Sequence, residues 1–135
     1  MPLNGQLSPL MADGDDRVLI GGIFYPNGSS AVSNTSNKPL NRASLWTVAR
    51  TSAGLFTITL ATPFARFFPA WATLGLTTGD DKFAQWTGAT ELTTADSLLI
   101  RVWDISGAAV DDVAADAGNW ISWGGFVVNT GVSRP

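Results

Sequence analysis

The chain has 135 residues, the size of one domain, and a formal net charge of −3. It contains no cysteine and no histidine, which excludes disulfides and thiolate chemistry and removes the commonest general base. Charged residues make up 14% of the chain, against about 25% in an average domain. Part of the surface is therefore expected to lie against other subunits, and the acidic balance predicts no nucleic-acid partner.

The first segment, residues 1–16, holds two prolines, two glycines and three aspartates without periodicity. We expect it to form an extended N-terminal arm, with a disordered segment as the alternative, ahead of a single β-sandwich domain, residues 17–135. It lacks the basic and apolar regions of a signal peptide, and no apolar run in the chain approaches the roughly 20 residues of a membrane helix. The expectation is a protein made and used without export and without a membrane partner.

Short segments of alternating or apolar character follow, separated by turn residues. The stretch WTVARTSAGLFTITLATPF, residues 46–64, predicts a hairpin with Phe56, Ile58 and Leu60 on the core face and Thr57 and Thr59 on the other. Strands are expected at 17–25, 45–50, 55–61, 70–77, 82–87, 98–104 and 119–129. About seven or eight short strands without a convincing helix predict an all-β antiparallel β-sandwich or jelly roll.

Glycine and proline mark the expected irregularities in these strands. Gly21-Gly22 predicts a bulge or a close backbone approach, and Gly124-Gly125 predicts a bulge. The stretch TPFARFFP, residues 62–69, is interpreted as a linker between strands. The polar stretch 29–44 is expected to form a long loop.

Candidates for catalysis and metal binding are weak. The aspartate clusters (Asp13 with Asp15-Asp16, Asp80-Asp81, and Asp111-Asp112 with Asp116) lack the ligand spacing of a calcium loop and are interpreted as solvated turns. Glu91 is the single glutamate, whereas a glycosidase needs two carboxylates about one bond. We expect no enzyme activity, no metal and no cofactor.

Six tryptophans are the strongest functional candidates, and all fall in expected strands: Trp46, Trp71, Trp86, Trp103, Trp120 and Trp123. They favour a core and a subunit interface over an exposed sugar-binding platform, the alternative use of aligned tryptophans. Trp71 and Trp103 are expected to point outward, because their neighbours Ala70, Ala72 and Val102 fall on the inward face. We therefore expect these two side chains to make subunit contacts.

Four stretches in order carry a resemblance: FYPNGSS, WTVARTSAGLFTITLATPF, WATLGLTTGDDKFAQW and LLIRVWDISGAAVDDVAADAGNWISWGGFVV. They resemble the small β-rich structural proteins of tailed bacteriophages, namely the head decoration or cement proteins and related fibre modules. The resemblance covers roughly residues 17–129 and consists of sheet and turn motifs. The chain departs from the pattern at Trp123-Gly124-Gly125, where a simpler apolar strand end is expected.

The resemblance implies a homotrimer on the capsid surface of a virion, made in the bacterial host cytoplasm, whose partners are itself and the major capsid protein. Under this hypothesis the arm residues Leu3, Leu7, Leu10 and Met11 anchor to the shell, and Arg17 pairs with acidic capsid side chains. The alternative is a carbohydrate- or host-binding module of a phage tail fibre or spike.

Overall fold

The computed structural model describes residues 17–38, 45–61, 66–78, 81–87, 97–107, 112–116 and 118–128. Within these residues the chain forms seven strands and no helix, which confirms the predicted all-β class. The strands are β1 (Arg17–Phe24), β2 (Trp46–Ser52), β3 (Leu55–Leu60), β4 (Arg66–Gly75), β5 (Lys82–Trp86), β6 (Ser97–Asp104) and β7 (Trp120–Val128). The expected arm, residues 1–16, lies outside the described residues.

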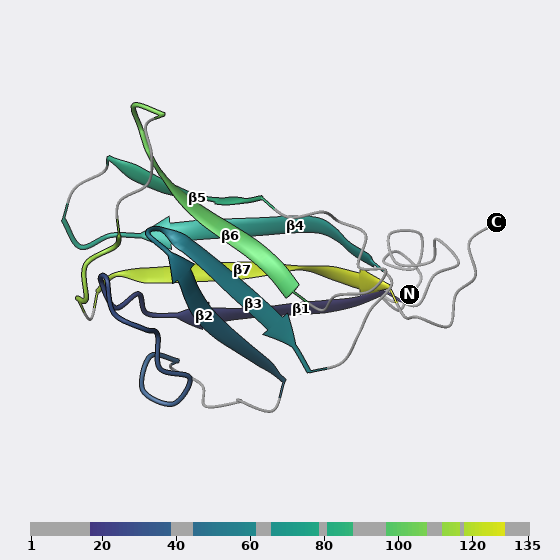
Figure 1. Ribbon diagram of the computed structural model, residues 1–135. Helices are drawn as coiled ribbons and strands as arrows, with labels where there is room; N and C mark the ends of the chain where they lie inside the picture. The colour runs from purple at the N-terminus through teal and green to yellow at the C-terminus, as the bar shows by residue number, and fades with distance from the viewer. Residues whose placement is uncertain are drawn as a thin grey trace, which may run out of the picture.

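Two antiparallel sheets pack face to face, as expected for a β-sandwich (Figure 1). One sheet has the strand order β1-β7-β4 and the other has the order β2-β3-β6-β5. The jelly-roll arrangement stays a prediction. Arg17 at the start of β1 pairs with Val128 at the end of β7, so both described ends of the chain lie side by side at one end of the sandwich.

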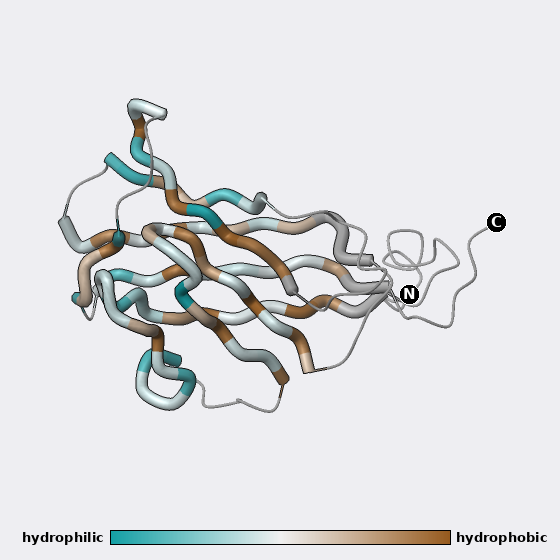
Figure 2. The backbone as a smooth tube through the Cα atoms, in the orientation of Figure 1, coloured by the Kyte–Doolittle hydropathy of each residue, from teal (hydrophilic) through white to brown (hydrophobic). Residues whose placement is uncertain are grey.

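The core lies between the sheets and follows from the alternation of apolar and polar residues along each strand (Figure 2). In the hairpin, Phe56, Ile58 and Leu60 are buried as predicted, while Thr57 and Thr59 fall on the outer face. The fully buried side chains include Phe24, Phe56, Ile58, Leu98, Ile100, Val102, Ile121 and Trp123. Each contributes about 1.5–3 kcal/mol by leaving water, so this layer holds the two sheets together.

Two buried tryptophans meet across the sheets, and a glycine makes room for them. The rings of Trp46 and Trp123 pack edge to face with their centroids 5.1 Å apart. Gly22 pairs with Trp123 in the ladder, and a Cβ at Gly22 would collide with the Trp46 ring. The Gly21-Gly22 pair therefore marks a close approach, the second of its two predicted alternatives, and not a bulge.

Two sequence-based expectations about irregular backbone are wrong. The ladder of β7 is continuous through Gly124 and Gly125 on both sides, so no bulge occurs there. The expected linker at 62–69 is part of a strand from Arg66 onward, and the register instead shifts between Phe67 and Ala70. That shift surrounds Pro69, which has no backbone N–H to donate to a ladder and is tolerated at a bulge.

The polar loop after β1 covers the free edge of β2. Asn34 donates from Nδ2 to the carbonyl of Val48 at 3.0 Å and accepts from the Val48 N–H at 2.8 Å. Lys38 donates to the carbonyl of Trp46 at 2.7 Å and lies 4.0 Å from the centre of the Trp46 ring. Burial lowers the pKa of Lys38. These side chains satisfy backbone groups that would otherwise template strand addition.

Replacing Gly22 by alanine tests the tryptophan packing. The added methyl group is expected to push the Trp46 ring off Trp123 and to lower the free energy of unfolding by about 1–3 kcal/mol, the usual cost of overpacking. Urea titration measures the loss. Combining Gly22→Ala with Trp46→Phe, which shortens the ring, should recover part of it, whereas simple additivity of the two losses would contradict the assigned clash.

Candidate interaction surface

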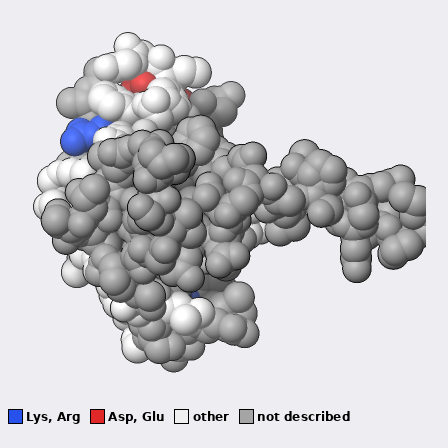
Figure 3. Space-filling view, turned by 90° about the vertical axis from the view of Figure 1, so that its right-hand side faces the viewer, with Lys and Arg blue, Asp and Glu red and all other residues white. Residues whose placement is uncertain are grey.

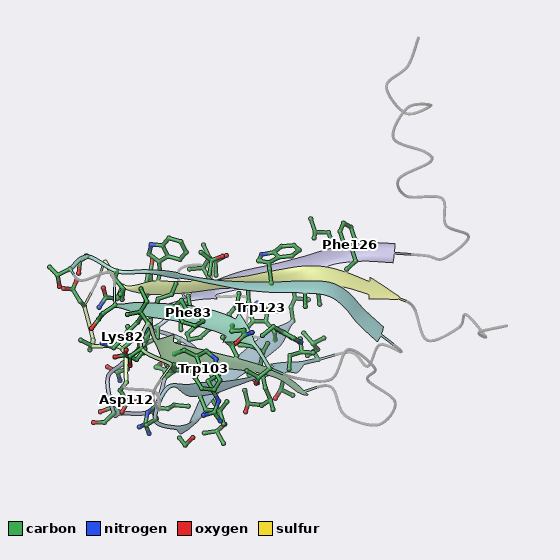
Figure 4. The ribbon with its side chains drawn as sticks, turned by 90° about the horizontal axis from the view of Figure 1, so that it is seen from above. Lys82, Phe83, Trp103, Asp112, Trp123 and Phe126 are labelled. Carbon is green, nitrogen blue, oxygen red and sulfur yellow. The ribbon has the colours of Figure 1, made fainter. Side chains whose placement is uncertain are left out.

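The outer face of the β1–β7–β4 sheet is apolar and aromatic, and we call it the β7 face. Figure 4 shows Phe126 on this outer side, while Trp123 points between the sheets. Every second side chain of β1, β4 and β7 points to this face. The side chains that the structure describes there are Leu19, Ile23, Trp71, Thr73, Trp120, Ser122 and Phe126. None of these is charged, although an exposed sheet face normally alternates to polar and charged residues.

Two tryptophans on this face lie against glycines of the neighbouring strand. In the β4–β7 ladder Trp71 stands opposite Gly124, and Trp120 stands opposite Gly75. An added Cβ at either glycine would collide with three atoms of the facing indole ring. Each ring therefore lies over the backbone of the partner strand, with Trp71 42% exposed and Trp120 36% exposed. Because glycine has no Cβ, each indole ring can pack directly on the backbone of the neighbouring strand.

An open depression of about 440 Å³ lies at the Trp120 end of the β7 face. It is lined by Ile23, Tyr25, Thr73, Trp120 and Ser122, and its exposed lining is mostly apolar. Three of these residues carry hydroxyl groups and Trp120 carries an indole N–H, and no charged side chain lines the depression. The depression can accept an apolar side chain or a small neutral group.

A second apolar patch lies on the other sheet and consists of Phe83, Trp103 and Ile105; we call it the β5–β6 patch. Phe83 pairs with Trp103 across the two strands, and Ile105 follows in the turn after β6. Phe83 is 45% exposed and Ile105 72% exposed, whereas Trp103 is half-buried. The guanidinium of Arg101 lies 5.4 Å from the centre of the Trp103 ring.

The turn that carries Ile105 is held by three hydrogen bonds. The Ile105 N–H donates to the carbonyl of Asp81 at 2.6 Å, and the Gly107 N–H donates to the carbonyl of Asp104 at 2.9 Å. The Ser106 N–H donates to the Asp104 carboxylate at 2.7 Å, and these contacts with Ser106 are the main reason that the pKa of Asp104 is lowered. Ile105 is thus presented to solvent by a well-defined turn.

The rest of the outer face of the β2–β3–β6–β5 sheet is rich in threonine. Thr47 pairs with Thr59, and Ala49 pairs with Thr57. The hydroxyl groups of Thr51 and Thr57 lie 2.6 Å apart. Hydroxyl groups bond readily to water, so this part of the surface suits exposure to solvent without a partner. In the end-on view of Figure 3, the described Lys and Arg atoms and the described Asp and Glu atoms form only small groups.

One ion pair joins β2 to the segment ahead of β7. Arg50 donates from Nε and Nη2 to the two carboxylate oxygens of Asp112, both at 2.7 Å, and the Gly54 N–H donates to the same carboxylate at 3.2 Å. The Arg50 hydrogen bonds hold the pKa of Asp112 below its usual range and raise the pKa of Arg50. Asp112 was interpreted from the sequence as part of a solvated turn, but the structure gives it a bidentate partner.

The structure places the predicted interface residues on different sheets. Trp71 points outward on the β7 face, as expected. Trp103 was also expected to point outward, but it is half-buried and packs against the core, and it lies on the other sheet. Arg17 is the first residue of β1, and its side chain is not among those that the structure describes. The four arm residues Leu3, Leu7, Leu10 and Met11 also lie outside the described residues.

Sequence reasoning missed Trp120 as an exposed residue and missed that Trp71 and Trp120 each face a glycine of the neighbouring strand. The signal is a shared spacing: Trp71 precedes Gly75 by four residues, and Trp120 precedes Gly124 by four. When two such strands pair antiparallel, each tryptophan can face the glycine of the other. The spacing was visible, but its meaning depended on knowing that β4 pairs with β7 in this register.

Among the described residues, no group of three His, Cys, Asp or Glu side chains is placed to hold a metal ion. The described part of the chain also contains no helix long and apolar enough to cross a membrane. No protein-family model matches this chain, and neither a curated protein nor a solved structure matches it. The surface itself therefore has to carry any argument about function.

Alanine at Gly124 or Gly75 tests the bracing of the exposed rings. Gly124→Ala should displace the Trp71 ring and Gly75→Ala the Trp120 ring, each lowering the free energy of unfolding by about 1–3 kcal/mol. Indole N–H signals in nuclear magnetic resonance spectra report each ring separately, and the signal of buried Trp123 serves as reference. Ser122→Ala on the same face is the matched control. Unmoved Trp71 and Trp120 signals would contradict the assigned contacts.

The Arg50–Asp112 pair predicts a pH-dependent part of stability. Because folding lowers the pKa of Asp112, the pair stabilises the fold fully above about pH 4. This contribution is lost as the pH falls through the lower pKa of the folded state. Asp112→Asn should therefore be less stable than the parent at about pH 7, and the difference should shrink toward about pH 2. Urea midpoints across this range measure it, and a difference that stays constant with pH would refute the assignment.

Proposed function

We propose that this chain is a structural virion protein that binds the outer surface of an assembled phage capsid as a homotrimer and stabilises the shell. The observation that carries the proposal is the β7 face, whose described side chains are uncharged and include two tryptophans packed on glycines. A contiguous apolar surface of this kind usually marks a protein contact. The resemblance to phage decoration proteins is the reason for proposing the capsid as the partner.

Capsid stabilisation asks little of such a protein beyond binding. Any ligand that binds the assembled shell and not its separated subunits stabilises the shell by mass action. The sandwich supplies a rigid surface for contacts, and residues 1–16 join it at the start of β1, next to the end of β7. Three arms carried by one trimer would engage the shell with a high effective concentration.

The second candidate is a carbohydrate-binding module of a phage tail fibre or spike. The observation that favours it is the depression beside Trp120, because an aromatic ring surrounded by the hydroxyl groups of Tyr25, Thr73 and Ser122 suits a neutral sugar. Its mostly apolar lining offers a sugar few hydrogen-bonding partners. Capsid decoration therefore stands first.

Co-sedimentation with expanded, DNA-free capsids of the phage that encodes the chain tests the proposal. We expect saturable binding and a rise in the melting temperature of the capsid. A variant in which the apolar arm residues Leu3, Leu7, Leu10 and Met11 are replaced by serine should bind at least about tenfold more weakly, which corresponds to about 1.4 kcal/mol. The matched control replaces the polar arm residues Asn4, Gln6 and Ser8 by alanine.

The same protein is applied to a glycan array. Glycan binding without capsid binding would replace the first function by the second. Capsid binding that is equal in the two arm variants would keep decoration but remove the arm from the contact.

A further inference from the structure

Exposed apolar side chains gather in two places on this protomer. Seven large hydrophobic side chains are exposed among the described residues. Four lie on the β7 face: Leu19, Ile23, Trp71 and Trp120. Two lie in the β5–β6 patch, Phe83 and Ile105, and the seventh is Leu45. The two patches belong to different sheets, so no single flat contact covers both.

The two patches also differ in shape. The β7 face contains the open depression beside Trp120 and Thr73, with a volume of about 440 Å³. The β5–β6 patch ends in Ile105, which is 72% exposed on a turn fixed by its hydrogen bond to Asp81. A projecting aliphatic side chain and a mostly apolar depression are complementary, and neither of them carries a charge.

Two different patches on one protomer are what a head-to-tail contact requires. A twofold dimer uses one self-complementary patch on both copies, whereas a ring joins one patch of each copy to a different patch of the next. We infer that the β7 face of one copy receives the β5–β6 patch of the next, with Ile105 in the depression beside Thr73 and Trp120. The inference deepens the proposed homotrimer by naming its two contact surfaces.

The number of exposed hydrophobic side chains that become covered favours a second copy of this chain over other occupants. The exposed parts of the four hydrophobic side chains on the β7 face amount to on the order of 300 Å². A stable interface buries about 800 Å² on each partner, so residues around each patch have to join the contact. A head-to-tail contact repeated around a ring covers both patches on every copy, and with them six of the seven exposed hydrophobic side chains described. A sugar in the depression would leave the β5–β6 patch in water.

Cysteine cross-linking tests the contact directly, because the chain has no cysteine of its own. The single variants Ile105→Cys and Thr73→Cys are prepared separately and oxidised either alone or as an equimolar mixture. We expect the mixture to give a disulfide-linked dimer with one copy of each variant, and each variant alone to give almost none. The double variant should give a covalent ring, which the proposed function predicts to contain three chains. Leu45→Cys mixed with Thr73→Cys is the matched control.

The cross-linking pattern distinguishes the head-to-tail contact from a twofold contact and from no specific contact. Cross-linking of Thr73→Cys or Ile105→Cys with itself would show a twofold contact and overturn the inference, as would a mixture that cross-links no better than the Leu45 control. Thr73→Arg should weaken self-association at least tenfold in sedimentation, whereas Thr59→Arg on the opposite sheet should not. A ring that forms without binding capsids would sink the decoration proposal and leave the contact standing. Loss of capsid binding in Thr73→Arg without any cross-linking would instead assign the β7 face to the capsid.

Discussion

The surface of this protein depends on one reciprocal arrangement, in which Trp71 lies over Gly124 and Trp120 lies over Gly75. A glycine in a strand interior costs about 0.5–1 kcal/mol in backbone entropy, so the pair is unfavourable for the sheet taken alone. The indoles offset this cost by covering the exposed backbone and packing against it. The result is a pair of large apolar rings that rest on the backbone of the neighbouring strand. Rings held in this way bind a partner at a smaller entropic cost than mobile side chains would.

The same use of glycine occurs on the inner side of that sheet. Gly22 leaves the space that the Trp46 ring fills from the opposite sheet, where it meets Trp123. The β1–β7–β4 sheet thus places tryptophan against glycine on both of its faces. Inside the sandwich this contact joins the two layers, and on the outer face it holds two exposed rings against the sheet.

The sequence predicted what depends on local pattern. Alternation along 55–60 placed Phe56, Ile58 and Leu60 in the core, and the turn residues separated the strands close to their observed ends. What it could not predict depends on pairing between distant strands. The bulge expected at Gly124-Gly125 was wrong because Gly124 leaves room for the Trp71 ring of β4, some fifty residues away in the chain, while the backbone stays in regular register there. A local rule for glycine has no access to that partner.

The sequence predicted that apolar residues lie on the surface, but not on which sheet each of them lies. Scarce charge and six tryptophans indicated a protein that is partly covered by others, and Trp71 was correctly expected to point outward. Trp71 and Trp103 were both expected to make subunit contacts, and they lie on different sheets because β4 and β6 belong to different layers. That separation is itself informative. Two unlike apolar patches on different layers fit a head-to-tail contact, which closes into a ring when the rotation between successive copies closes. Because Arg17 pairs with Val128, the two described ends of each copy would lie together at one end of its sandwich in any such assembly.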